Sequence, residues 1–274
     1  MYDLTTEYLK LLDNKQIDKK YRDCLEELIS NIITANYQNI EVVLLYGGLV
    51  RDSTIFENWS DIDIIIVFRD ISKRNAFKLA QIIERLETKY SIRIDLTQIS
   101  LEEIADGVLG RYCFNSEIIN ALSMREGVSI VVFGCVPNVN FTPEQERQAS
   151  LFYITNTLHL LRRFVVEVLY RGKLEDHIKA DLKRITRWLF SIIRASLRLF
   201  NVYTHPYEYS IPYLKQVFPE LDTLLLVQLT HIRKNIIAYN TSELVQIVQE
   251  IERFAEEYVT LCLRRYANEI ERNK

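Results

Sequence analysis

The hydrophobic positions of this chain follow mixed periods up to about residue 140 and one helical period afterwards. In the first part, apolar residues recur every three or four positions in three long segments, which predicts helices at about 3–14, 17–36 and 73–89. Between them lie short apolar or alternating runs, which predict strands that begin near 42, 61, 91 and 128. From Glu144 onward every periodic segment is helical, and we expect helices at about 144–170, 175–200, 209–216, 220–238 and 241–271.

This order of elements predicts an α+β protein with two domains. We expect a mixed-sheet domain at residues 1–140 and an all-α helical bundle at residues 141–274, because Pro137, Asn138 and Pro143 interrupt the chain between the two patterns. The segments 151–169 and 185–200 are apolar over more than one stripe, so we expect them at the centre of the bundle. The second domain is predicted to bind an acceptor or to form a homodimer.

The composition indicates the class of protein and its compartment, but it does not indicate a function. The 274 residues are 48% apolar and 26% charged, as in globular proteins that are not embedded in a membrane. A formal charge of −3 argues against a broad electrostatic grip on nucleic acid. The four cysteines form no CxxC pair, so neither a zinc ribbon nor a disulfide framework is indicated. Without a signal peptide or an apolar run of membrane length, we expect a cytoplasmic protein with no membrane partner.

The segment LLYGGLVRDSTIFENWSDIDIIIV carries the chemistry. Gly47 and Gly48 follow an apolar strand and allow backbone angles and close ligand approach that side chains forbid. A short helix that begins just after them would present backbone N–H groups to an anion such as a phosphate. Asp61 and Asp63 alternate with buried-type isoleucines on the next strand, so both carboxylates face one side. Paired carboxylates with phosphate oxygens are the usual ligands of magnesium.

This segment resembles the nucleotidyltransferase superfamily typified by DNA polymerase beta. The family pattern is an apolar strand, Gly followed by Gly or Ser, a spacer, and then Asp-apolar-Asp, with a third acidic residue on a later strand. Asp95 in SIRIDLTQIS matches that third residue. Asp52 stands where the family usually has a glycine, so the loop after Arg51 departs from the pattern.

The resemblance implies roles for individual residues. Asp61, Asp63 and Asp95 would be catalytic and would bind metal, with two Mg²⁺ ions expected and Asp95 also accepting the proton of the acceptor hydroxyl. The alternative for Asp95 is an ion pair with Arg93 or an edge position. The triphosphate, ATP by expectation, would contact four further residues: Gly47, Gly48, Arg51 and Ser60. Arg51 is equally consistent with an exposed helical arginine, and Ser60 with a turn cap.

The helical second part resembles kanamycin nucleotidyltransferase and related antibiotic-modifying enzymes, and equally fusions to HEPN-type helical bundles. The first hypothesis is therefore transfer of a nucleoside monophosphate, AMP by expectation, to a hydroxyl of an aminoglycoside-like small molecule, with release of pyrophosphate. The alternative is an antitoxin-like enzyme that modifies a macromolecule, either a tyrosine of a HEPN-type toxin partner or a tRNA end. A binding module that has lost turnover is a third hypothesis, against which the intact aspartate set argues.

The second part also contains a group of tyrosines and a segment that can be compared with HEPN ribonucleases. Tyr203, Tyr207, Tyr209 and Tyr213 suggest a polar and aromatic loop that either stacks on a substrate or packs internally. Ribonuclease activity of the HEPN type is not supported, because IRKNIIAYN has Tyr239 where that family has histidine. We expect the acceptor to bind between the two domains.

Overall fold

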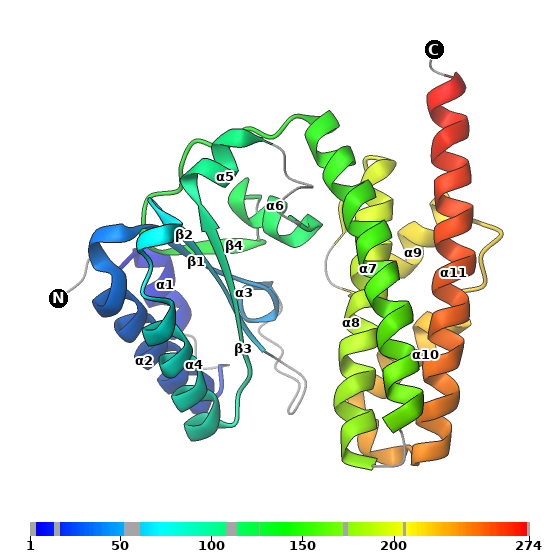
Figure 1. The fold of residues 1–274 in the computed structure, drawn as a ribbon, viewed down its shortest axis with the longest axis horizontal. Coiled ribbons are helices and arrows are strands. Elements are labelled where there is room, and N and C mark those ends of the chain that lie inside the picture. Colours follow the sequence, from blue (N-terminus) through cyan, green and yellow to red (C-terminus); the bar gives the residue numbers. More distant parts are fainter. Residues whose placement is uncertain are drawn as a thin grey trace. The chain divides into compact units, whose positions relative to one another are not determined.

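The computed structural model describes residues 4–13, 17–51, 61–107, 114–125, 127–171, 175–204 and 207–272. These residues form two compact units, which we call the sheet unit (residues 1–112 and 117–142) and the helical unit (residues 113–116 and 143–274). Figure 1 shows the helices and strands of both. Each unit has its own hydrophobic core.

A four-stranded mixed sheet forms the centre of the sheet unit. The strands are β1 (Ile40–Tyr46), β2 (Ile62–Phe68), β3 (Ile94–Ser100) and β4 (Ser129–Gly134), and their order in the sheet is β3-β2-β1-β4. Strands β2 and β3 are parallel, whereas β1 is antiparallel to both β2 and β4. Because β2 and β3 run in the same direction, residues at their starts lie at the same end of the sheet.

Helices cover one face of this sheet (Figure 1). They are α1 (Thr6–Leu12), α2 (Lys19–Asn36) and α4 (Ala76–Tyr90). Their apolar stripes share a core with alternate residues of β2, namely Ile62, Ile64 and Ile66, all of which are fully buried. The alternation of strand side chains therefore sends Asp63 and Ile65 to the opposite face.

Short elements complete the sheet unit. They are η1 (Tyr37–Asn39), α3 (Gly48–Arg51), η2 (Ile71–Lys73), α5 (Leu101–Asp106) and α6 (Ser116–Leu122). A capping box formed by Ser100 and Glu103 begins α5. The predicted start of strand β3 was near Ser91, but the strand begins at Ile94. Ser91 instead adopts a left-handed conformation (φ 49°) that ends α4. Helix α6 likewise ends before Met124, which has a φ of 48°.

The helical unit contains only helices among its described residues. They are α7 (Pro143–Arg171), α8 (Glu175–Leu199), α9 (Tyr207–Val217), α10 (Leu224–Lys234), η3 (Ile236–Ala238) and α11 (Thr241–Arg272). Helix α8 packs against α7, α9 and α11, and every residue from 189 to 199 is buried, which confirms its predicted central place.

The prediction that α7 is also central was wrong. One stripe of α7 is buried, but its outer face exposes large apolar side chains, including Val166 (65%) and Tyr170 (88%). Helix α7 therefore has one buried apolar stripe and a second apolar stripe that is exposed to solvent. Among the described helices, none combines the length and the apolar character that crossing a bilayer requires.

Candidate functional site

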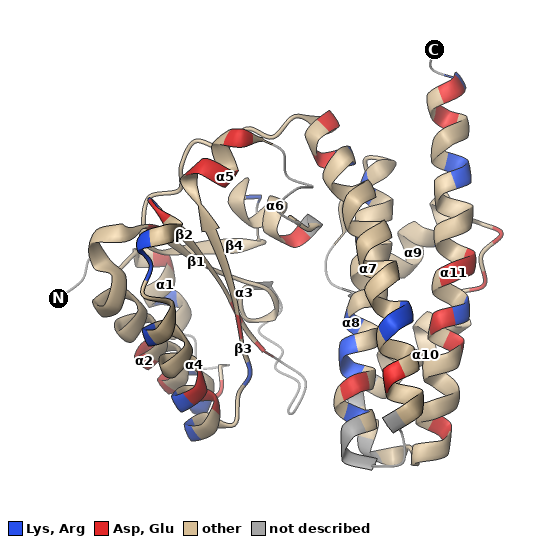
Figure 2. Ribbon diagram, viewed as in Figure 1, with Lys and Arg blue, Asp and Glu red and all other residues tan. Residues whose placement is uncertain are grey.

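The predicted aspartates lie at one end of the sheet, where β2 and β3 begin. Asp63 and Asp95 are direct register partners in the parallel pair of β2 and β3. Register partners on neighbouring strands point to the same face, and such strands lie about 4.8 Å apart. Asp61 lies directly before β2, two positions from Asp63. Figure 2 shows acidic residues at the starts of these two strands.

Gly47 brings the end of β1 against this pair. Its φ is +80°, in the left-handed region that favours glycine. A Cβ added at Gly47 would lie 2.9 Å from Cγ of Asp63, closer than side-chain atoms tolerate. The missing side chain therefore makes room for the Asp63 carboxylate. Gly48 differs, because a Cβ there would meet no atom within 4 Å.

Helix α3 begins directly at Gly48, as the sequence predicts for a turn followed by a short helix. The structure describes four residues of α3, and the backbone feature that it shows beside Asp63 is the turn at Gly47. The side chain of Arg51 and the whole of Ser60 lie outside the described residues, so their proposed phosphate contacts stay predictions.

Tyr46 is a site residue that the sequence reasoning missed. It is 6% exposed, pairs with Asp63 across β1 and β2, and places its hydroxyl 3.5 Å from Oγ1 of Thr97. Burial raises the pKa of the Tyr46 phenol well above its usual value of 10.0. The negative charges of Asp63, Glu117 and Asp95 raise that pKa further. The phenol therefore stays protonated beside the acidic side chains.

The acidic residues of this site were predicted to hold metal ions. In the part of the chain that the structure describes, no three His, Cys, Asp or Glu side chains form a group that could hold a metal ion. The three predicted aspartates thus do not make a complete metal centre of their own. Asp63 and Asp95 nevertheless fit the type of magnesium site in which one or two carboxylates act together with substrate phosphates.

The predicted tyrosine-rich loop is largely helical. Helix α9 begins at Tyr207, so Tyr213 lies within a helix rather than in a loop. Tyr203 is 45% exposed, while its hydroxyl donates to Glu146 Oε2 at 3.3 Å and the Arg198 guanidinium lies 4.9 Å from its ring centre. Tyr203 thus has packing contacts within the helical unit and also an exposed surface, and stacking on a substrate stays a prediction.

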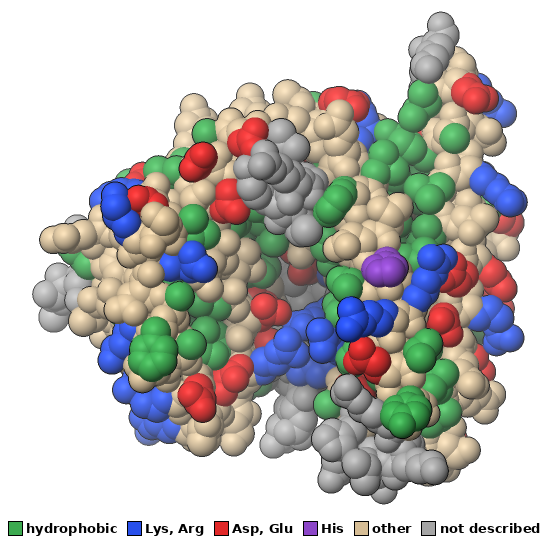
Figure 3. Space-filling model, in the orientation of Figure 1, with side chains coloured by type: hydrophobic (Ala, Val, Ile, Leu, Met, Phe, Trp, Pro, Cys, Tyr) green, Lys and Arg blue, Asp and Glu red, His purple; other side chains and the backbone are tan. Residues whose placement is uncertain are grey.

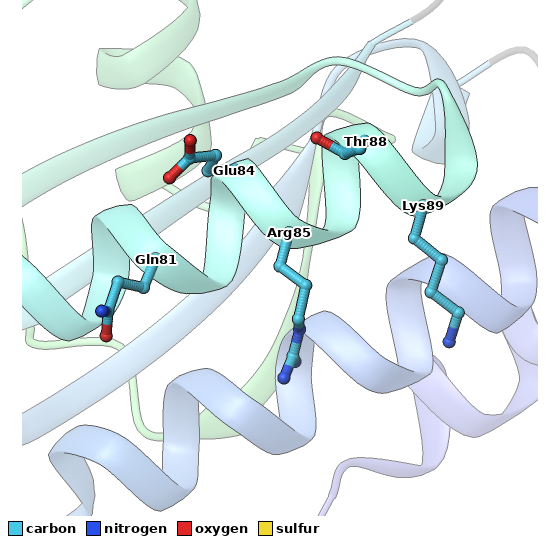
Figure 4. A pocket seen from close by; sticks show the side chains of 5 residues that line it. All are labelled: Gln81, Glu84, Arg85, Thr88 and Lys89. Carbon is cyan, nitrogen blue, oxygen red and sulfur yellow. The ribbon is translucent and has the colours of Figure 1, made fainter.

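Two surface hollows of the sheet unit lie away from the aspartates. One, of about 400 Å³, runs along α4 and is lined by Gln81, Glu84, Arg85, Thr88 and Lys89 (Figure 4). Its cations are already paired, since Arg85 and Lys89 contact Glu27 of α2 at 3.2 and 2.6 Å. These ion pairs join α2 to α4, and the hollow carries no chemistry of its own.

The other hollow, of about 730 Å³, lies beside η1 and η2. Its cations are also engaged: Arg69 pairs with Glu41 at 2.8 Å, and Lys73 pairs with Asp70 at 2.9 Å. Figure 3 shows acidic and basic side chains interspersed over the visible face, in keeping with the small formal charge.

Comparisons with known proteins were made on the sequence and on the fold. No family model matches the sequence, and no curated protein sequence matches it either. The fold matches spectinomycin adenyltransferase AAD(9) from Enterococcus faecialis, whose structure holds ATP and spectinomycin. The TM-score is 0.50, with 12% identity over 85% of this chain and 98% of that chain. A nucleotidyltransferase-like protein from Exiguobacterium sibiricum 255-15 matches with a TM-score of 0.35, 14% identity, and coverage of 91% and 80%.

The first of these matches identifies the fold. This chain shares the fold of the spectinomycin adenyltransferase, with a mixed sheet followed in this chain by a helical C-terminal part. The predicted α+β class and the predicted structural resemblance are confirmed.

Proposed function

We propose that this protein is a magnesium-dependent nucleotidyltransferase that moves AMP from ATP to a hydroxyl of a small molecule and releases pyrophosphate. The observation that carries the proposal is the register of Asp63 with Asp95 beside Gly47. It supplies two adjacent carboxylates next to a turn from which a side chain is excluded. The fold neighbour with ATP and spectinomycin supports ATP as the donor and a small molecule as the acceptor.

Each residue has a chemical task in this proposal. Asp61, Asp63 and Asp95 would hold magnesium together with phosphate oxygens of the nucleotide, and bound magnesium would neutralise charge that develops on those oxygens. The turn at Gly47 and Gly48 would bring backbone N–H groups close to the triphosphate. Arg51 and Ser60 are proposed as further phosphate contacts.

The proposed transfer replaces one phosphorus–oxygen bond by another. The acceptor oxygen forms a bond to the α-phosphorus, the bond from that phosphorus to the bridging oxygen breaks, and pyrophosphate leaves with the electron pair. Asp95 takes the proton of the acceptor hydroxyl and passes it to water. General-base catalysis of this kind contributes about 10²–10⁴-fold to the rate.

The test is pyrophosphate release measured with ATP, Mg²⁺ and a panel of hydroxylated acceptors that includes spectinomycin and kanamycin. We expect release that depends on both an acceptor and Mg²⁺, and that is lost in Asp95→Asn. Asp70→Asn, a change in a half-buried carboxylate that pairs with Lys73 beside η2, is the matched control and keeps activity. Acceptor-independent ATP hydrolysis that persists in Asp95→Asn contradicts the proposal. Tyrosine-bearing proteins and tRNA in the same panel test the macromolecular alternative.

A further inference from the structure

Tyr46 occupies an unusual place for a buried tyrosine. It ends β1 and pairs with Asp63 in β2, which in turn pairs with Asp95 in β3. The three side chains therefore form one row on the face opposite the core that packs against α1, α2 and α4. Directly opposed side chains on adjacent strands interact, so the Tyr46 ring is a neighbour of the Asp63 carboxylate.

The hydroxyl of Tyr46 reaches beyond β2, the strand next to its own, and approaches β3. It lies 3.5 Å from Oγ1 of Thr97, which belongs to β3, while β2 lies between β1 and β3. The ring must therefore extend across β2. Tyr46 pairs with Asp63, whereas Thr97 pairs with Ile65. The ring therefore crosses β2 between Asp63 and Ile65, which are successive residues on this face.

From this placement we propose that Tyr46 is a positioning residue, whose buried ring spans β2 and fixes the Asp63 and Asp95 carboxylates at the separation that a metal–nucleotide complex requires. This inference rests on the proposed nucleotidyl transfer. The buried phenol provides a rigid, uncharged surface with a polar tip beside the two carboxylates. A shorter side chain would remove this lateral contact from the row of side chains.

The sheet unit contains a matched control. Tyr8 of α1 is also buried, at 1% exposure, but it packs in the core on the other face of the sheet. Its hydroxyl has no hydrogen-bond partner among the described residues. Tyr8→Phe therefore removes a buried hydroxyl without touching the carboxylates, and it reports what a purely structural role would cost.

The experiment compares wild type, Tyr46→Phe, Tyr46→Leu, Thr97→Val and Tyr8→Phe. We expect Tyr46→Phe and Thr97→Val to raise the Mg²⁺ concentration for half-maximal activity about 10-fold, the size of effect seen when supporting partners of metal ligands are removed. The KM for ATP at saturating Mg²⁺ stays within about 2-fold, because the nucleotide contacts themselves are retained. Tyr46→Leu gives the larger loss, and Tyr8→Phe leaves Mg²⁺ dependence unchanged.

A second readout does not depend on turnover. Binding of Mn²⁺ in the presence of α,β-methylene-ATP, which cannot be cleaved between its α- and β-phosphates, is followed by electron paramagnetic resonance. Tyr46→Phe is expected to weaken Mn²⁺ binding by the same factor as it shifts the Mg²⁺ dependence, with a melting temperature equal to that of wild type. Equal Mn²⁺ binding by wild type and Tyr46→Leu overturns the positioning role. Tight Mn²⁺ binding by a wild type that transfers no nucleotide contradicts the proposed reaction, while weakening by Tyr46→Phe still supports the role of Tyr46.

Discussion

The Cα of Gly47 lies against the carboxyl group of Asp63. The contact joins the end of β1 to the start of β2, and it leaves no room for a Cβ, which would lie 2.9 Å from Cγ of Asp63. Gly47 also has a φ of +80°, so steric fit and backbone conformation both require glycine. The conformation of the turn at Gly47 and the position of the Asp63 carboxylate therefore depend on each other.

Gly47→Ala is expected to lower both stability and transfer. The left-handed backbone and the clash with Asp63 together cost about 1–3 kcal/mol, as strained backbone positions do. Gly48→Ala is the matched variant for stability, because a Cβ there meets no atom within 4 Å and alanine favours the helix that begins at Gly48. Urea denaturation of both variants checks this. Equal free energies of unfolding for the two would contradict the assigned role of Gly47.

A buried ion pair in the helical unit is expected to be important for stability. Arg198 Nη1 lies 3.2 Å from Glu146 Oε2, and their side chains are 2% and 6% exposed. Removing one partner leaves a buried charge, so Glu146→Gln should cost about 3–5 kcal/mol. The double variant Glu146→Gln, Arg198→Met should cost less than the sum of the single changes.

The exposed pair of Arg162 with Glu256 is the control for that prediction. Its side chains are 52% and 36% exposed, so Arg162→Ala should cost less than about 1 kcal/mol. Far-UV circular dichroism during urea denaturation measures both sets. A cost for Arg162→Ala equal to that for Glu146→Gln would show that burial does not decide the contribution of these pairs.

Two buried thiols should resist alkylation well above neutral pH. Burial, the largest cause, raises the pKa of Cys24 from 9.0 to about 11 and that of Cys262 from 9.0 to about 12. Iodoacetamide at pH 8 should therefore modify the exposed Cys135 and leave both of these unmodified, as mass spectrometry of the digested protein would show. Rapid modification of Cys262 at pH 8 would contradict its placement in the core.

The same thiols give stability a predictable dependence on pH. In the unfolded chain they ionise near their ordinary pKa of 9.0, whereas in the folded chain they ionise only near 11 and 12. Their contribution is thus complete below pH 9 and is lost as the pH rises through those higher values. Changing Cys262 to Ala should reduce the alkaline loss of stability, measured as the melting temperature between pH 8 and pH 11.

Much of this arrangement followed from local sequence signals. The alternating residues around Asp63 and Asp95 indicated two strands that each carry a carboxylate, and the register shows that these strands are neighbours. The capping box at Ser100 set the start of α5. Helices of the second part were located within a few residues, because their caps and periods are encoded locally.

What the sequence could not indicate depends on tertiary contacts. Tyr46 was read as one more apolar strand residue, because only the pairing of β1 with β2 brings it beside Asp63. Gly47 and Gly48 are identical in sequence terms, yet only Gly47 contacts Asp63. The apolar outer face of α7 was predicted to be buried, since hydrophobicity alone does not tell which of two apolar stripes meets the core.

The central claim is that Asp63, beside Gly47 and Asp95, is required for nucleotidyl transfer. The most direct measurement is transfer of label from ATP radioactive in its α-phosphate to hydroxylated acceptors in the presence of Mg²⁺, with wild type and Asp63→Ala compared at equal folded concentration. We predict labelled acceptor with wild type and a loss of about 10²–10³-fold with Asp63→Ala, as for other residues that stabilise transition-state charge. Equal transfer of label by the two proteins would contradict the account.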